Sequence, residues 1–121
     1  DLTFTYPTSS QPVLKGINAE IAPGQIVGIL GRTGSGKTTL LNLLLRLYNV
    51  KPGTLKLDGV DIDQVSVGVL RDSIGYVPQD SFLFSATIKE NIDFASTGSD
   101  MGRITEYAKI AQVFDNIVEF P

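Results

Sequence analysis

The feature that most constrains this chain is a glycine-rich segment, residues 31–39, that joins an apolar run to a leucine-rich one. It fits the pattern G-x-x-x-x-G-K-[ST]. The fixed positions of this pattern are Gly31, Gly36, Lys37 and Thr38. Residues 25–30 form a short apolar run of the buried-strand type, and residues 39–47 are too long and too rich in leucine for a strand. We therefore predict a buried strand, a glycine loop and a buried helix, in an α/β fold.

The residue types in this loop predict a site for a nucleoside triphosphate. Glycines at positions 31, 34 and 36 let the backbone approach phosphate oxygens, so that N–H groups and the following helix N-terminus form an anion site. Lys37 then reaches the β- and γ-phosphates, the Thr38 hydroxyl ligates Mg²⁺, and Thr39 adds a phosphate hydrogen bond. The expected ATP-binding residues of the loop are Gly31, Arg32, Thr33, Gly34, Ser35, Gly36, Lys37, Thr38 and Thr39. The alternative is a glycine-rich turn with an ordinary surface lysine, which the flanking elements disfavour.

Composition limits the remaining chemistry. None of the 121 residues is a cysteine or a histidine, which excludes disulfides, thiolate or imidazole metal sites and an imidazole base from these residues. The net charge is −3 and no basic run stands out, so we predict no direct nucleic-acid partner. No run has membrane-spanning length, and no segment has the pattern of a signal peptide. The composition fits a globular cytosolic domain or part of one.

Short elements are expected on both sides of the loop. The predicted strands outside it are residues 1–6, 13–21, 54–57 and 74–77. Asp58 and Gly59 form a hairpin turn after the third of these strands. Helix N-caps are expected at Ser66, Thr87 and Asp100, the second within a capping box completed by Glu90. Residues 96–99 form a short loop. The C-terminal third is therefore predicted to be helical.

Four segments, taken in order, carry a family resemblance. Residues 4–7 (Phe-Thr-Tyr-Pro) resemble an A-loop, residues 31–39 a Walker A loop, and residues 76–80 (Tyr-Val-Pro-Gln-Asp) a Q-loop. Residues 83–92 resemble the exporter-type segment that opens a helical subdomain. Over nearly its whole length, the chain resembles the first half of the nucleotide-binding domain of an ABC transporter, in the exporter-like branch where this domain follows transmembrane helices.

The resemblance implies a fold and roles for single residues. The implied fold is a P-loop NTPase core with an antiparallel β subdomain (residues 1–80), followed by the start of a helical subdomain (residues 81–121). Tyr6 would stack on adenine, and Val13 would pack near the base and ribose. Gln79 would reach Mg²⁺ and the attacking water, and would share the catalytic role with Lys37. From the residues alone, Tyr6 is more often a half-buried core residue and Gln79 more often an exposed loop amide; only the resemblance favours the nucleotide-binding roles.

The resemblance also implies partners and a location. A second nucleotide-binding domain would bind head to tail, and coupling helices of a membrane domain would contact the apolar tip at residues 82–84. The alternative for this tip is a satellite hydrophobic cluster. The implied location is the cytoplasmic face of a membrane, which would be the cell inner membrane in a bacterium.

Several motifs of the family are not found in these residues. They are the LSGGQ motif, an apolar Walker B strand ending in Asp, a catalytic Glu after it and a switch histidine. We therefore expect a truncated domain that is marginally stable and binds nucleotide without turning it over, within a parent ATPase that drives transport. The alternatives are an importer-type or non-transport ABC ATPase, and a nucleotide-binding or dimerisation module without turnover.

Overall fold

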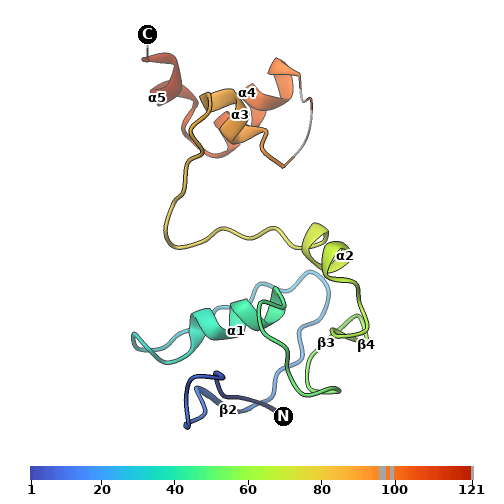
Figure 1. The fold of residues 1–121 in the computed structure, drawn as a ribbon. Coiled ribbons are helices and arrows are strands. Elements are labelled where there is room, and N and C mark those ends of the chain that lie inside the picture. Colours follow the sequence, from blue (N-terminus) through green and yellow to red (C-terminus); the bar gives the residue numbers. More distant parts are fainter. Residues whose placement is uncertain (96–97, 99, 121) are drawn as a thin grey trace. The chain divides into compact units, whose positions relative to one another are not determined.

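The computed structural model describes residues 1–95, 98 and 100–120. The loop expected at residues 96–99 lies largely outside this description. The chain divides into two compact units, Asp1–Tyr76 and Val77–Pro121. Figure 1 shows the elements of each unit. In the described part of the chain, no helix has the length and apolar character needed to cross a membrane.

The first unit is built on a small antiparallel sheet and one helix. Strand β1 (Leu2–Phe4) pairs with β2 (Leu14–Ile17), in a register that places Phe4 opposite Leu14. Helix α1 (Lys37–Leu44) packs on this pair, because Leu43 is fully buried against Leu2, Phe4 and Leu14. Partly buried side chains surround this core: Tyr6, Val13, Leu40, Val50 and Leu55. The core therefore holds the N-terminal hairpin against the helix that follows the glycine loop.

The second hairpin confirms the prediction made from its turn. Strands β3 (Lys56–Leu57) and β4 (Val60–Asp61) are antiparallel neighbours. Asp58 and Gly59 between them both have positive φ, 50° and 81°. A two-residue turn of this kind matches the right-handed twist of its strands, and Asp-Gly is among the pairs that tolerate it best.

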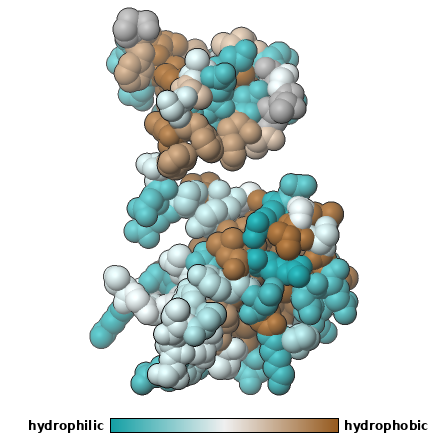
Figure 2. Space-filling view, viewed as in Figure 1, coloured by the Kyte–Doolittle hydropathy of each residue, from teal (hydrophilic) through white to brown (hydrophobic). Residues whose placement is uncertain are grey.

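Two predicted strands are wrong in this structure. Residues 25–30 are extended and unpaired, and Ile26 and Leu30 are 101% and 97% exposed. Residues 74–77 are also unpaired, with Val77 91% exposed. The physical reason is that a buried strand needs ladder partners, whereas the sheets of the described residues are only the pairs β1–β2 and β3–β4. Apolar side chains therefore reach the surface of the molecule (Figure 2).

Helix α1 is shorter than predicted, because it ends at Leu44 instead of residue 47. The N–H of Arg46 donates to the Leu43 carbonyl and that of Leu47 to the Asn42 carbonyl, which is a Schellman ending. Arg46 takes the left-handed position of this motif, with φ 50°. Leu41, within α1, and Leu47, after its end, are exposed, whereas the leucine pattern predicted a buried helix.

Helix α2 (Val67–Asp72) confirms the N-cap at Ser66, whose hydroxyl accepts from the N–H of Val69. It also stabilises the end of α1. The Arg71 guanidinium donates to the carbonyls of Leu45 and Arg46 at 3.1 and 3.3 Å. A cation at these carbonyls complements the negative end of the α1 dipole.

The described residues of the second unit form helices α3 (Ile88–Ile92), α4 (Met101–Ile110) and α5 (Phe114–Val118). The predicted capping box is present, because the Glu90 N–H donates to Thr87 Oγ1 while the Thr87 N–H and hydroxyl donate to the Glu90 carboxylate. These two bonds from Thr87 hold the pKa of the Glu90 carboxyl below its ordinary value. Asp100 caps α4 through the N–H of Arg103, as predicted.

Candidate functional site

The glycine loop leads into the N-terminus of α1, which has no side-chain cap. Gly36 is the N-cap residue, with φ 93° and ψ 8°, and no side-chain hydrogen bond closes this end. By contrast, side chains of Ser66, Thr87 and Asp100 accept hydrogen bonds at the N-termini of α2, α3 and α4. The N-terminal N–H groups of a helix have no partner within the helix, so at α1 they are left for a ligand or solvent.

Close contacts surround Gly36 and Gly31, and both Gly36 and Gly34 have a left-handed backbone angle. A Cβ at Gly36 would lie 2.8 Å from the Leu14 side chain and 3.2 Å from the Val13 carbonyl oxygen. A Cβ at Gly31 would lie 2.5 Å from Ser35 Oγ. Gly34 has φ 79°, in the left-handed region that side chains rarely adopt. The loop thus fits the backbone-only cradle that a phosphate group needs, because side chains at these positions would fill or distort it.

Lys37 closes the loop on itself. Its ammonium donates to the carbonyl oxygens of Gly31 and Arg32 at 2.8 and 2.9 Å. The Ser35 N–H donates to the same Arg32 carbonyl at 3.1 Å. The positive charge is therefore held at the loop by two neutral acceptors, which a phosphate oxygen can replace with a stronger charge-assisted bond.

The segment of sequence that contains the loop carries only basic charges. Residues 21–57 contain no Asp or Glu, yet they carry basic side chains at Arg32, Lys37, Arg46, Lys51 and Lys56. No cluster of three or more His, Cys, Asp or Glu that could bind a metal ion occurs within the described ranges. Mg²⁺ in nucleotide sites takes most of its ligands from phosphates and water, so the single hydroxyl of Thr38, exposed on α1, fits this kind of site.

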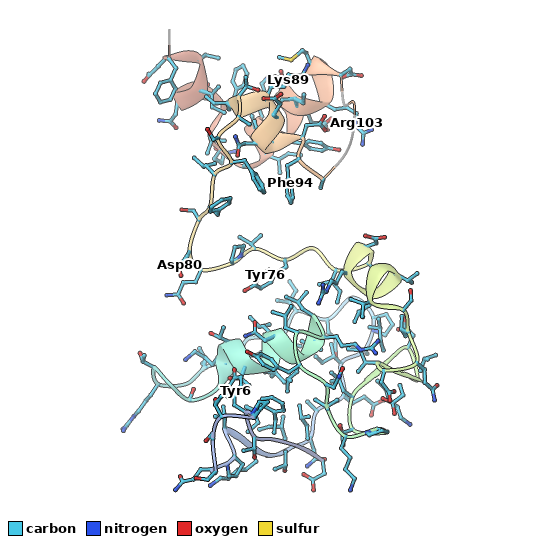
Figure 3. The ribbon with its side chains drawn as sticks, viewed as in Figure 1. Tyr6, Tyr76, Asp80, Lys89, Phe94 and Arg103 are labelled. Carbon is cyan, nitrogen blue, oxygen red and sulfur yellow. The ribbon has the colours of Figure 1, made fainter. Side chains whose placement is uncertain are left out.

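The structure brings two further predicted residues, Val13 and Tyr6, to the loop. Val13 lies beside Gly36, because a Cβ added at Gly36 would be 3.1 Å from the Val13 side chain and 3.2 Å from its carbonyl oxygen. The Tyr6 hydroxyl lies 2.9 Å from Thr39 Oγ1. Figure 3 shows Tyr6 next to α1. Tyr6 is half-buried, so both interpretations made from the sequence, a core position and a base-stacking ring, agree with its exposure.

Gln79 lies in the second unit and is exposed. The glycine loop belongs to the first unit, and the two are described separately. The role of Gln79 at the loop therefore stays a prediction.

Tyr48 is a contact residue that sequence reasoning missed. Its ring centroid lies 5.0 Å from that of Tyr6 and 5.8 Å from that of Phe4, and the Tyr6 and Phe4 rings are 5.1 Å apart. These are edge-to-face or tilted contacts, which stabilise aromatic pairs. The available signal was weak, namely an aromatic residue just after a leucine-rich helix.

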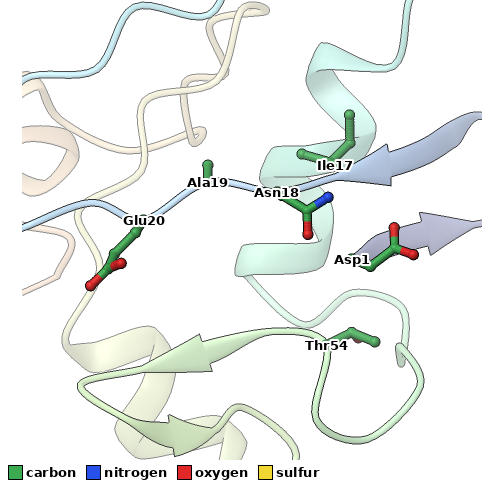
Figure 4. Close-up of a pocket in the computed structure, with 6 residues that line it drawn as sticks. All are labelled: Asp1, Ile17, Asn18, Ala19, Glu20 and Thr54. Atoms are coloured by element: carbon green, nitrogen blue, oxygen red, sulfur yellow. The ribbon is translucent and has the colours of Figure 1, made fainter.

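A shallow hollow of about 430 Å³ elsewhere in the first unit does not suit a nucleotide (Figure 4). Its lining residues are Asp1, Ile17, Asn18, Ala19, Glu20 and Thr54. Asp1 and Glu20 bring carboxylates to this lining, which repel phosphate. The glycine loop remains the better place for an anion.

An aromatic cluster of Phe82, Phe84 and Phe94 marks the second unit. Phe84 lies 5.1 Å from Phe82 and 5.4 Å from Phe94 between ring centroids, and Phe82 and Phe94 are mostly exposed. The Asn91 carboxamide holds the adjoining loop, because it accepts from the Phe84 N–H and donates to the Phe84, Ala86 and Thr87 carbonyls. The residues at the loop tip thus form an exposed apolar surface on a fixed backbone.

A glycine loop with a lysine in the first turn of the following helix is the arrangement of phosphate-binding loops. The family model described as ABC transporter matches residues 14–119. This chain belongs to the ABC transporter family.

Individual relatives support the exporter branch. The heavy metal tolerance protein of Schizosaccharomyces pombe is 42% identical over 99% of the chain and 14% of its own length. A putative multidrug export ATP-binding/permease protein of Staphylococcus aureus is 40% identical over 99% of the chain and 21% of its own length. A solved bacterial Atm1-family ABC exporter with ATP bound is 38% identical, with a TM-score of 0.92 over 99% of this chain and 21% of that one. The chain thus has the fold of part of an ABC ATPase domain and spans about a fifth or less of these relatives.

Proposed function

We propose that this chain binds Mg-ATP at the glycine loop and forms the ATP-binding part of an exporter that couples ATP binding and hydrolysis to transport across a membrane. The observation that carries the proposal is the N-terminus of α1, which has no side-chain cap and follows a loop that Lys37 closes with two hydrogen bonds. The family membership and the exporter relatives support the same function.

Each residue of the site has its own role in binding Mg-ATP. The backbone of residues 31–38 holds the phosphates, and Lys37 leaves its carbonyl partners to neutralise the β- and γ-phosphates. Thr38, with Gln79 in the assembled protein, would hold Mg²⁺, which supplies charge neutralisation to the phosphates when it is bound. Tyr6 stacks on the adenine and Val13 borders the base and ribose. Gln79 orients the attacking water.

The proposal includes two protein partners on the cytoplasmic face of the membrane. A second nucleotide-binding domain binds head to tail with this one, so that Mg-ATP lies between the two domains. A membrane domain contacts the exposed aromatic cluster of Phe82, Phe84 and Phe94. Exposed apolar patches of this kind mark protein interaction sites.

Lys37→Ala tests the proposal in the full-length protein. Loss of the cation should lower steady-state ATP hydrolysis about a hundredfold or more, while the backbone cradle retains part of the ATP affinity. Lys56→Ala, at an exposed position of β3, is the matched control and should keep the wild-type rate. A Lys37→Ala rate within a few-fold of wild type would overturn the assignment.

A further inference from the structure

The carboxamide of Asn91, on α3, binds the backbone of the loop that precedes this helix. Its Oδ1 accepts from the Phe84 N–H at 2.7 Å. Its Nδ2 donates to the carbonyl oxygens of Phe84, Ala86 and Thr87 at 3.1, 3.3 and 3.0 Å. A carboxamide offers two amide hydrogens and one acceptor oxygen, and Asn91 directs both kinds of group at this one stretch of backbone. The loop is therefore held to α3 by a side chain.

Phe84, which Asn91 binds at both its N–H and its carbonyl, is the middle ring of the aromatic cluster. Its ring centroid lies 5.1 Å from that of Phe82 and 5.4 Å from that of Phe94. Phe94, labelled in Figure 3, follows the C-cap residue of α3. The same short helix thus carries Phe94 beyond its end and fixes the backbone of Phe84 through Asn91.

The three rings are exposed although the backbone between them is fixed. Phe82, Phe84 and Phe94 are 74%, 48% and 68% exposed, and residues 81–84 form neither helix nor strand. Because the rings bury little area among the described residues, the hydrogen bonds of Asn91 contribute more to the shape of this surface than to a core. A loop that is ordered before a partner arrives avoids the entropic cost of ordering it on binding.

We infer that Asn91 is a positioning residue for the interface with the membrane domain, because it sets the place of Phe84, and with it the spacing of the three rings, before the partner binds. The inference rests on the proposed function, since the membrane domain is the partner of that proposal. A purely structural role for Asn91 would be to stabilise α3, which the capping box of Thr87 and Glu90 also does. Removing either Asn91 or Glu90 therefore separates the two roles.

The test measures how fast hydroxyl radicals oxidise the three rings in the full-length protein, with mass spectrometry as the readout. Rings that the membrane domain covers should oxidise slowly in the wild type. Asn91→Asp keeps the shape of the side chain but loses the amide donors and places a carboxylate against three carbonyl oxygens, and Asn91→Ala removes all four hydrogen bonds. In both variants the oxidation rates should rise at least about fivefold, because displaced rings no longer fit the partner and water enters the interface. Both variants should keep the wild-type dissociation constant of Mg-ATP, because the glycine loop belongs to the other unit.

Two variants serve as controls. Glu90→Ala, on the same helix, removes the capping box but leaves the carboxamide of Asn91 and its backbone partners in place. Asn116→Ala removes a carboxamide at an exposed position of α5. Both should leave the three rings oxidising at the wild-type rate.

Four outcomes would contradict the account. Wild-type oxidation rates in both Asn91 variants would overturn the inference, although slow oxidation of the wild-type rings would still support the proposed partner. An equal rise in Glu90→Ala would overturn it as well, because Asn91 would then act only by stabilising α3. A loss of Mg-ATP binding in the Asn91 variants would overturn it in favour of a role in the whole domain. If the wild-type rings oxidised as fast as in the urea-unfolded protein, the proposed partner would be wrong and the inference with it.

Discussion

Replacing Gly36 by alanine tests how closely the glycine loop lies against the N-terminal hairpin. A Cβ at this position meets the Leu14 side chain at 2.8 Å, the Val13 side chain at 3.1 Å and the Val13 carbonyl at 3.2 Å. Leu14 is buried in the core and the Val13 carbonyl is backbone, so neither can move freely. The glycine also has φ 93°, which strains any side chain.

The free-energy cost of Gly36→Ala has a backbone term and a packing term. A residue other than glycine in the left-handed region costs about 1–2 kcal/mol. Forcing an extra methyl into a packed site costs about 1–3 kcal/mol more. Gly36→Ala should therefore destabilise the start of α1 by about 2–5 kcal/mol. Gly34→Ala is the matched control, because Gly34 has φ 79° but nothing within 4 Å of its added Cβ, so only the first term applies.

Hydrogen exchange of the α1 amides in the full-length protein measures this local stability. The Leu40 N–H, which donates to the Gly36 carbonyl, is the reporter. Since each 1.4 kcal/mol of local opening free energy changes protection tenfold, Gly36→Ala should lose at least about thirtyfold and clearly more than Gly34→Ala. Equal losses in the two variants would show that the loop does not lie against Val13 and Leu14, and the reasoning would fail.

Three further predictions concern single side chains. Tyr6→Ala should weaken ATP binding by about 1–3 kcal/mol, whereas Tyr6→Trp should bind ATP like the wild type. If Tyr6→Ala lowered thermal stability without changing the dissociation constant of ATP, Tyr6 would be a core residue only. Because hydrogen bonds from Thr87 lower the pKa of Glu90 from its ordinary value of 4.5, the stability that this cap contributes is present above that pH and is lost as the pH falls through the lowered pKa. Amide exchange at the start of α3 should rise over that range in the wild type but stay flat in Glu90→Gln, and parallel profiles would refute this. Asn91→Ala should raise exchange at the Phe84 N–H about tenfold or more, because its acceptor is lost, whereas Asn116→Ala, exposed on α5, should leave it unchanged.

The local elements of the fold could be predicted because their causes lie in neighbouring residues. The Asp58-Gly59 turn depends on two residues that tolerate positive φ. The caps at Ser66, Thr87 and Asp100 depend on side chains that accept from the backbone N–H three positions later. The strands predicted at residues 25–30 and 74–77 depend on ladder partners, which no local pattern can supply. The early end of α1 at Leu44 depends on Arg46, whose guanidinium donates to carbonyls of Ile62 and Val65.

In the candidate site, too, local features could be predicted from the sequence and tertiary contacts could not. The glycine loop and its lysine were evident from a pattern of eight residues, and the structure shows why Gly36 must lack a side chain. Other contacts depend on the tertiary structure or on one loop. They are the hydrogen bond between Tyr6 and Thr39, the ring contact between Tyr6 and Tyr48, and the hydrogen bonds of Asn91 to the loop at Phe84. Their residue types are common in other roles, so no spacing rule identifies them.

The most direct test of the central claim is a structure of the full-length protein with Mg²⁺ and a non-hydrolysable ATP analogue. We predict that the phosphates lie against the backbone of residues 31–38, at the N-terminus of α1. Lys37 Nζ should have left the carbonyls of Gly31 and Arg32, which it contacts at 2.8 and 2.9 Å here, to bind phosphate oxygen. A bound nucleotide with its phosphates elsewhere, or with Lys37 still on those two carbonyls, would contradict the account.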